Sequence, residues 1–218
     1  MKTIIFDLDG TILDTLRDLT EAVNYALRVF GLPEKDLEFV RKAIGNGTQV
    51  LIKRCTPDTI PPEKREKVFK EFKNYYLNHY ADFTKPYKGI KELLEKLQNK
   101  CQFAVVSNKD NDLVHRIIEK EFPNLFQIIQ GSYLDKPKKP DPYLINKILS
   151  ENNINKRDTL YIGDTDVDKE SALNAGLVYC LVNYGYRTKE ELKKTCPEVN
   201  TFSTVDELHS FIMLWVNL

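Results

Sequence analysis

Two carboxylates, Asp7 and Asp9, lie two residues apart, directly after the apolar run Thr3 to Phe6 and directly before Gly10. The β-branched and aromatic residues of this run predict a buried strand, and the glycine predicts a tight turn where the strand ends. Because the two aspartates are at alternate positions, their side chains can leave the backbone on the same side. An Asp-x-Asp-Gly sequence by itself is also a common turn, since aspartate is a turn former.

A second acidic cluster makes a simple turn much less attractive as the explanation. Asp164 and Asp168 follow the β-rich run that ends at Ile162. In an open parallel sheet, ligands bind beyond the carboxyl ends of the strands, so both clusters are expected at one edge. Four neighbouring carboxylates repel one another unless a cation lies between them. A site of oxygen ligands with no nearby His or Cys favours Mg²⁺ over zinc.

The elements that must position these groups can be read from the segment after Pro86. Helical patterns there alternate with short runs of β-forming residues, which is typical of a parallel sheet covered by helices. The expected strands are 103–106, 126–129, 159–162 and 177–182, and the expected helices are 89–100, 110–121, 142–150, 168–175 and 205–216. Polar residues also follow the strand at 103–106, in the sequence Ser107-Asn108-Lys109.

The segment between the first strand and Phe83 has a different pattern. Apolar residues recur at helical spacing over 16–30, 36–44 and 62–80, and no run predicts a strand. We therefore expect an α/β core formed by residues 1–14 and 84–218, interrupted by an all-helical domain at 15–83.

Four segments of the chain resemble the four ordered motifs of the haloacid dehalogenase superfamily, in its phosphatase branch. They are Asp7-Leu8-Asp9-Gly10-Thr11, Ser107-Asn108-Lys109, Lys139-Pro140-Asp141-Pro142 and Gly163-Asp164-Thr165-Asp166-Val167-Asp168. Their order and their places after expected strands agree with that family. The resemblance implies a Rossmann-like parallel sheet with a helical cap domain inserted after the first strand.

The resemblance also implies a covalent mechanism. Asp7 would be the nucleophile that takes the phosphoryl group, which is an established use of a carboxylate. Asp9 would protonate the leaving alkoxide and then activate the water that hydrolyses the aspartyl phosphate. Lys139 would offset the negative charge on the phosphoryl group and on Asp7.

The remaining motif residues would bind the phosphoryl group and Mg²⁺. Phosphoryl oxygens would be held by Thr11, Ser107 and the backbone amides around Gly10 and Asn108. Mg²⁺ would be bound by Asp7, by the carbonyl of Asp9 and by Asp164, with Asp168 as a further ligand or as a residue that supports the ligands.

Three neighbouring residues have ordinary interpretations. Lys109 is equally consistent with an exposed residue at a helix start. Asp166 is consistent with an N-terminal cap of the following helix. Arg187 lies in a stretch that also resembles this branch of the family, but a surface position would explain it.

The helical insertion resembles the caps of this superfamily, which close over the core site, exclude water and select a small phosphorylated substrate. Its segment Arg41 to Arg54 resembles the cap segment of phosphoglycolate phosphatases. Four basic residues and the amides of Gly45-Asn46-Gly47 are available there for an acidic substrate: Arg41, Lys42, Lys53 and Arg54. The same segment also reads as a helix terminator followed by another helix.

Alternative functions remain open. A sugar-phosphate mutase, or a phosphatase for hexose phosphates, nucleotides or pyrophosphate, would use the same Asp7 and Asp9. The mutase is disfavoured because no histidine follows the first motif closely, and a dehalogenase is disfavoured by Asp9. A scaffold without catalysis is disfavoured because Asp7, Asp9 and Lys139 are all present. A signalling receiver is disfavoured by the motif order and by the inserted domain.

The amino-acid composition limits the kinds of partner that the protein can bind. The 218 residues carry 32 Lys and Arg against 32 Asp and Glu, a formal net charge of zero, which is unlike a nucleic-acid-binding protein. The four cysteines form no Cys-x-x-Cys pair, and the apolar run before Asp7 is too short for a signal peptide or a membrane span. We therefore expect a cytoplasmic monomer or homodimer that acts on a small phosphorylated metabolite and binds neither nucleic acid nor membrane.

Overall fold

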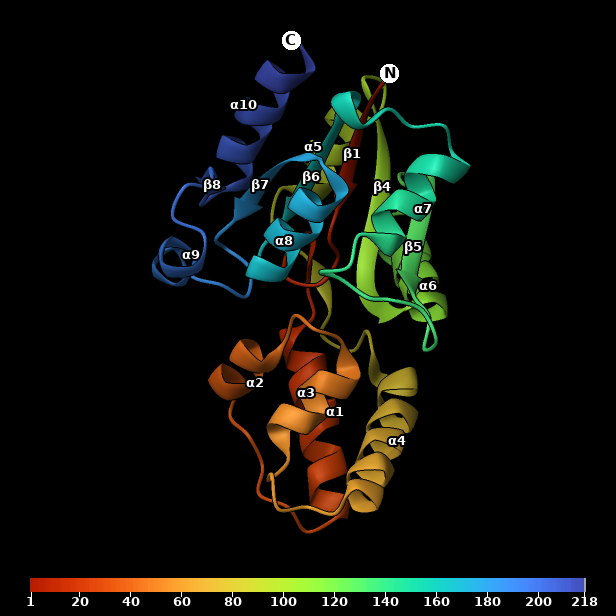
Figure 1. Ribbon diagram of the computed structural model, residues 1–218, viewed down its shortest axis with the longest axis vertical. Helices are drawn as coiled ribbons and strands as arrows, with labels where there is room; N and C mark the ends of the chain where they lie inside the picture. Colours follow the sequence, from red (N-terminus) through yellow and green to blue (C-terminus); the bar gives the residue numbers. More distant parts are fainter. Residues whose placement is uncertain (218) are drawn as a thin grey trace. The chain divides into compact units, whose positions relative to one another are not determined.

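A six-stranded parallel sheet forms the centre of the computed structural model, which describes residues 1–217. Its strand order is β5-β4-β1-β6-β7-β8, so the first strand of the chain lies in the middle (Figure 1). The strands are β1 Lys2–Phe6, β4 Cys101–Asp110, β5 Ile128–Ser132, β6 Thr159–Gly163, β7 Val178–Val182 and β8 Thr201–Phe202. This arrangement confirms the expected α/β fold with a parallel sheet.

Helices follow the strands in the order expected for β-α units. They are α5 Ile90–Leu97, α6 Asn111–Glu121, α7 Tyr143–Glu151, α8 Asp166–Ala175, α9 Lys189–Thr195 and α10 Val205–Val216, with a short 3₁₀ turn at Lys156–Asp158. One face of the sheet is covered by α7 and α8, whose apolar side chains form one buried cluster with residues of β1, β4 and β6. Central strands buried in this way have continuous apolar runs, as β1 has over Ile4, Ile5 and Phe6.

Several element boundaries differ from the sequence predictions. The strand predicted at 126–129 lies at Ile128–Ser132, because its buried, paired part includes the polar Gln130 and the glycine after it. The strand predicted to end at residue 106 continues to Asp110, where a second register pairs it with Ser132. The sequence reading also missed the short elements α9 and β8.

Helix α8 begins two residues earlier than predicted. Its N-terminal cap is Thr165, whose hydroxyl accepts a hydrogen bond from the amide of Asp168, while the Asp168 side chain accepts one from the amide of Thr165. This reciprocal pair is a capping box. Asp166 is thus the first helical residue and not the cap.

The chain separates into two compact units, one formed by residues 1–13 with 86–218 and the other by residues 14–85. The second unit contains four helices, α1 Leu16–Val29, α2 Leu37–Ala43, α3 Thr48–Cys55 and α4 Pro62–His79. Within it α1 packs against α4, with the rings of Tyr25 and Tyr75 stacked 4.1 Å apart between centroids. The two chain connections, β2 Leu13–Asp14 and β3 Lys85–Pro86, form a two-stranded sheet.

Within residues 1–217, no helix combines the length and the apolar character needed to cross a membrane.

Candidate active site

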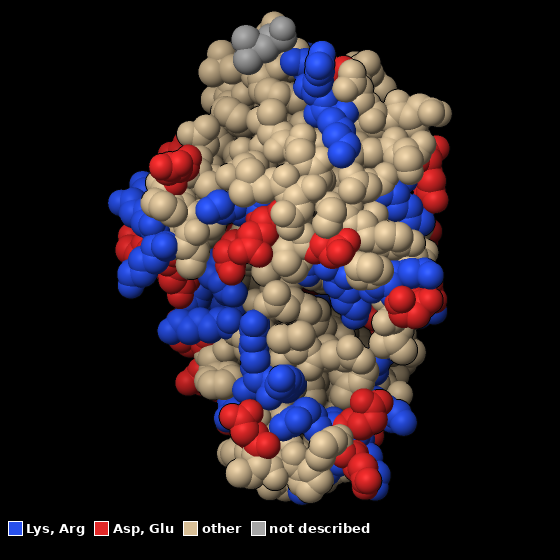
Figure 2. Space-filling view, viewed as in Figure 1, with Lys and Arg blue, Asp and Glu red and all other residues tan. Residues whose placement is uncertain are grey.

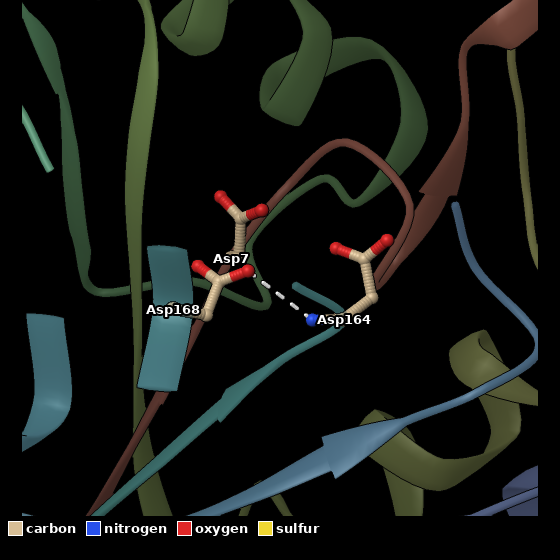
Figure 3. A group of neighbouring side chains, drawn as sticks. All are labelled: Asp7, Asp164 and Asp168. Atoms are coloured by element: carbon tan, nitrogen blue, oxygen red, sulfur yellow. Dashed lines mark hydrogen bonds between the residues drawn. The ribbon is translucent and has the colours of Figure 1, made fainter. Parts of the chain in front are cut away.

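Three carboxylates meet at the carboxyl edge of the sheet. Asp7 follows β1, Asp164 follows β6, and Asp168 lies in the first turn of α8 (Figure 3). β1 and β6 are neighbours, and the amide of Asp7 donates to the carbonyl of Ile162 at 2.8 Å, which brings the two strand ends together. One carboxylate oxygen from each of the three residues lies within 4.8 Å of those from the other two.

Lys139 places its ammonium among these carboxylates. Its Nζ donates to Asp7 Oδ1 at 2.7 Å, to Asp168 Oδ1 at 2.8 Å and to the Tyr161 hydroxyl at 3.1 Å. All four residues are buried. Asn108 fixes the backbone of the lysine: its side-chain amide donates to the Lys139 carbonyl at 3.0 Å, and its side-chain oxygen accepts from the Lys139 amide at 2.8 Å.

Asp168 has both carboxylate oxygens fully engaged. Oδ1 accepts from Lys139 and from the Tyr161 hydroxyl, the latter at 3.0 Å. Oδ2 accepts from the amide of Asp164 at 3.2 Å (Figure 3). It also accepts from the amide and the hydroxyl of Thr165, at 3.1 and 2.7 Å. A carboxylate with five donors is held rigidly, so Asp168 supports the arrangement of Lys139 and of the loop that carries Asp164.

Asp164 is held by donors on both of its oxygens. The backbone amide of Tyr186 donates to Oδ2 at 2.7 Å, and the Thr11 hydroxyl approaches Oδ1 at 3.3 Å. Two glycines allow the close approach. A Cβ on Gly10, whose φ is +86°, would overlap the Asp164 carboxylate, and a Cβ on Gly185 would overlap the carbonyl oxygen of Gly10. Both positions therefore require glycine on steric grounds.

Asp9 is paired with Lys109. The lysine Nζ contacts both carboxylate oxygens, at 2.7 and 2.8 Å. Lys109 is only 4% exposed, so the interpretation of this residue as an exposed helix start is wrong. The reason is that β4 continues to Asp110, which places Lys109 in the strand and not on the helix surface.

Of the residues expected to bind phosphoryl oxygens, Thr11 contacts Asp164, and Ser107 lies in β4, two residues before Lys109. Thr11 and Ser107 are buried, and Ser107 Oγ accepts from the amide of Lys109 at 3.2 Å. The amide of Gly10 donates to the carbonyl of Leu13 at 2.8 Å, closing the turn. Gly10 therefore contributes close packing against Asp164, and its N–H is already used within the turn.

The electrostatics of the site are unbalanced, because one ammonium faces three carboxylates. Burial and, after it, the nearby Asp168 raise the pKa of Asp7 to about 7, against the opposing effect of Lys139. Burial and Asp168 also raise the pKa of Asp164 well above its usual value. Although burial opposes it, the charge of Lys139 and the hydrogen bonds hold the pKa of Asp168 below its ordinary value. Lys139 thus compensates Asp168 and leaves Asp7 and Asp164 short of positive charge.

The donor set fits a divalent cation. Two carboxyl groups held in disfavoured charged states would be relieved by a hard cation, and an all-oxygen set matches Mg²⁺. Asp7 and Asp164 are the members with capacity to bind it, whereas Asp168 is saturated by its five donors.

Sequence reasoning did not identify three residues of this cluster. The Tyr161 hydroxyl bridges Lys139 and Asp168, and Gly185 and the amide of Tyr186 close around Asp164. In the sequence, Tyr161 is indistinguishable from an ordinary core residue of its strand. The Tyr184-Gly185-Tyr186 stretch follows β7, the next strand along the same edge, and that position was the available signal. Arg187, beside it, lies 3.9 Å from Asp166.

Comparison with known proteins gives the family. The profile of the haloacid dehalogenase-like hydrolases matches residues 4–182. A phosphoglycolate phosphatase of Aquifex aeolicus is 35% identical over 188 residues, covering 85% of this chain and 86% of that protein. A phosphoglycolate phosphatase of Aliivibrio fischeri is 31% identical over 207 residues, covering 91% of each.

A solved structure agrees in fold over nearly the whole chain. A crystal structure from Lactobacillus delbrueckii subsp. bulgaricus, provisionally described as a phosphoglycolate phosphatase, has a TM-score of 0.90 and 30% identity, and the match covers 97% of this chain and 99% of that one. The chain belongs to the haloacid dehalogenase-like hydrolases, and it is a phosphatase of that family.

Proposed function

We propose that this phosphatase hydrolyses a small phosphomonoester, 2-phosphoglycolate or a close analogue, through an aspartyl phosphate on Asp7 and with Mg²⁺. The observation that carries the proposal is the contact between Asp7 and Lys139, buried beside Asp164 at the carboxyl edge of the sheet. The names of the Aquifex and Aliivibrio relatives support the choice of phosphoglycolate.

In the first step Asp7 attacks the phosphorus. Lys139 holds Oδ1, and no hydrogen bond within residues 1–217 engages Oδ2, which supports Oδ2 as the attacking oxygen. A bond forms between Asp7 and phosphorus while the bond to the leaving oxygen breaks. Asp9 supplies a proton to the departing alkoxide, which would otherwise leave as a strong base.

In the second step a water molecule attacks the phosphorus of the aspartyl phosphate. Asp9 accepts a proton from this water, and the bond between Asp7 and phosphorus breaks, which releases inorganic phosphate and regenerates the carboxylate. Lys139 offsets the charge on the phosphoryl group in both steps. The hydroxyls of Thr11, which lies 3.3 Å from Asp164 Oδ1, and of Ser107 would donate to the phosphoryl oxygens.

Asp7, Asp164 and the carbonyl of Asp9 would hold Mg²⁺, which supplies positive charge that lets an anionic ester approach a site rich in carboxylates. Asp168 would act through its hydrogen bonds to Lys139 and to the Asp164 loop, and not as a ligand.

The helical domain, residues 15–83, would serve as the cap that excludes bulk water and selects the substrate. Its own contacts narrow the candidates for substrate binding. Arg54 donates to the carbonyl of Ala43 and to the side chain of Asn46, at 2.8 and 2.9 Å, so it braces the Gly45-Asn46-Gly47 loop. Arg41 donates twice to Glu38. Lys42 pairs with the same Glu38, at 3.0 Å. We therefore assign the substrate carboxylate to the exposed Lys53 and the loop amides.

A substrate panel tests the proposal. Phosphate release is measured from 2-phosphoglycolate, hexose phosphates, nucleoside monophosphates and pyrophosphate, each with Mg²⁺ and with a chelator. The expected result is fastest Mg²⁺-dependent release from 2-phosphoglycolate. Faster turnover of another ester would correct the substrate, and isomerisation of a hexose phosphate without phosphate release would indicate a mutase. Undiminished activity in the chelator would show that the reaction does not need Mg²⁺.

A further inference from the structure

We propose that Lys109 is a positioning residue for Asp9, holding in place the carboxyl group that transfers the leaving-group proton. This proposal rests on the phosphatase mechanism proposed above and assigns a function to the third residue of Ser107-Asn108-Lys109. The contact that motivates it is the pair of bonds from one ammonium to both oxygens of one carboxylate, at 2.7 and 2.8 Å.

The pair is largely withdrawn from water. The side chain of Lys109 is 3% exposed and that of Asp9 is 16% exposed. An ammonium is buried to this extent only when it is paired, because transfer of an unpaired charge from water is strongly unfavourable. An exposed ion pair between flexible side chains would fix little. A buried lysine that reaches both oxygens restricts where the carboxylate can lie.

The backbone of Lys109 is anchored independently of Asp9. Its amide donates to Ser107 Oγ, and its carbonyl accepts from Ser132 Oγ, both at 3.2 Å. Gly131 of β5 lies against it, since a Cβ there would come within 2.8 Å of the Lys109 carbonyl oxygen. The lysine is therefore held by the β4 and β5 strands, while Asp9 belongs to the turn after β1. The ammonium links a rigid strand end to a catalytic turn.

The two buried lysines of the site divide the carboxylates between them. Lys139 contacts Asp7 and Asp168, and Lys109 contacts Asp9. Asp7 and Asp9 are two residues apart yet have different tasks in the proposed mechanism, one at phosphorus and one at the leaving oxygen. Separate ammonium partners keep the two carboxylates apart and aimed at different atoms.

The dependence of kcat/KM on the leaving group distinguishes positioning of Asp9 by Lys109 from simple charge neutralisation. Departure of 4-nitrophenolate needs little protonation because it is a weak base, whereas an alkoxide needs the proton of Asp9. Both esters carry the same phosphate charge. The ratio of kcat/KM for 4-nitrophenyl phosphate to kcat/KM for an alkyl phosphate therefore reports on Asp9, since kcat/KM covers the steps up to phosphoryl transfer.

The experiment compares Lys109→Met with the parent on 4-nitrophenyl phosphate and on the best alkyl ester of the panel. We expect the alkyl ester to lose at least about tenfold more in kcat/KM than the aryl ester, because general acid catalysis contributes about 10²–10⁴-fold. Lys109→Arg keeps the charge and can hold both oxygens, so it should restore much of the ratio. Lys91→Met, which removes a half-exposed lysine elsewhere, should leave the ratio unchanged.

Equal loss on both esters in Lys109→Met would overturn the proposal, because it would indicate charge neutralisation or damage to the fold. Circular dichroism identifies a misfolded variant, and Lys109→Gln, which keeps a hydrogen-bond donor, then takes its place with the same criterion. A parent enzyme inactive on both esters would refute the phosphatase mechanism itself, and this proposal with it, which separates the two failures.

Discussion

Asp7 is a buried carboxyl group that the folded protein holds against its preference for water. Burial and the neighbouring Asp168 raise its pKa to about 7, while Lys139, which lowers it, is shared with Asp168. A strained group of this kind at the proposed centre of chemistry is typical of active sites, where stability is lost for function.

The Asp7→Asn variant should therefore lose turnover and gain stability in metal-free buffer. The raised pKa means that the folded protein binds a proton more tightly than the unfolded chain. As pH rises from about 4 to about 7, ionisation of Asp7 progressively lowers the free energy of unfolding of the parent, by at most roughly 4 kcal/mol. Asparagine does not titrate, so the stability gap between variant and parent should widen across this window.

Urea unfolding of both proteins at several pH values in the presence of a chelator measures the gap. A gap that stays constant between pH 4 and 7 would contradict the assignment of the strain to Asp7. Phosphate release from the variant at the parent's rate would contradict its role as nucleophile.

At the residue scale, the sequence predicted the groups that do the proposed chemistry better than the groups that hold them. Asp7, Asp164 and Asp168 could be predicted because each belongs to a motif after an expected strand. Lys139 could be predicted because its motif resembles that of the family, and the structure brings the four residues together. Tyr161 and the Tyr186 amide could not, because a tyrosine in an apolar strand and a backbone N–H carry no distinguishing pattern. Lys109 needed the true end of β4, which local composition does not give.

At the scale of elements, the turn after β1 and the loop after β7 interlock through glycine. Gly185 lies against the carbonyl oxygen of Gly10 and the side chain of Asp164, so no Cβ fits there. Tyr186, the next residue, donates its amide to Asp164. The loop can therefore hold Asp164 only if residue 185 has no side chain.

The Gly185→Ala variant should lose Mg²⁺ affinity by about tenfold or more and lose stability by roughly 2 kcal/mol, because the added methyl group would push Asp164 and the turn apart. Gly176→Ala is the matched control. It has a φ of +71° and open space around its Cβ position, so it should cost about 1 kcal/mol of conformational strain and leave Mg²⁺ affinity unchanged. Calorimetric titration with Mg²⁺ measures both variants, and equal affinities would refute the interlock.

Within the helical unit, the buried carboxylate of Asp18 connects the beginning of the unit to its end. Asp18 in the first turn of α1 accepts from the amides of Phe83 and Thr84, at 3.0 and 2.8 Å, and from the Thr84 hydroxyl at 2.7 Å. It thereby ties the start of the first helix to the segment after the last one. The sequence offered no sign of this tie, because the partners are 65 and 66 residues away.

The Asp18→Ala variant should destabilise the protein by roughly 3 kcal/mol, since it leaves two backbone donors without their charged acceptor. Thermal unfolding followed by circular dichroism measures the loss. Asp58→Ala, which removes an exposed carboxylate of the same unit, should change stability by less than about 0.5 kcal/mol. Similar losses in the two variants would show that Asp18 does not close the unit.

The sequence predicted which helices and strands exist better than it predicted where each one begins and ends. The long helices α1, α4 and α10 were predicted within about a residue because their apolar positions repeat over several turns. β5 and the end of β4 were misplaced because their last residues are polar or glycine, and their pairing depends on neighbours distant in sequence. The short α9 and β8 have too few residues to show a period.

For the whole molecule, the formal net charge of zero agrees with the mixed charges of the surface but does not show the uneven charge of the site. Basic and acidic side chains are interspersed over the face shown in Figure 2. The buried edge of the sheet is different, because Asp7, Asp164 and Asp168 face the single ammonium of Lys139. The folded protein therefore carries a local excess of negative charge that a bound cation would neutralise.

Mg²⁺ should stabilise the whole protein for this reason. A ligand that binds only the folded state adds about 2.7 kcal/mol when its concentration is 100 times its Kd, and the melting temperature should rise with Mg²⁺ concentration. The rise should vanish in Asp164→Asn and persist in Lys53→Ala, whose exposed side chain lies outside the carboxylate cluster. A thermal shift that survives Asp164→Asn would place the cation elsewhere.

The central claim is that Asp7 carries the phosphoryl group, and trapping the phosphorylated enzyme tests it most directly. The protein is quenched with acid during turnover, digested and analysed by mass spectrometry. We expect one added phosphoryl group on the peptide that contains Asp7, confined to that residue on fragmentation and absent in Asp7→Asn. Turnover with no phosphorylated peptide at any quench time, or a phosphoryl group on another residue, would contradict the account.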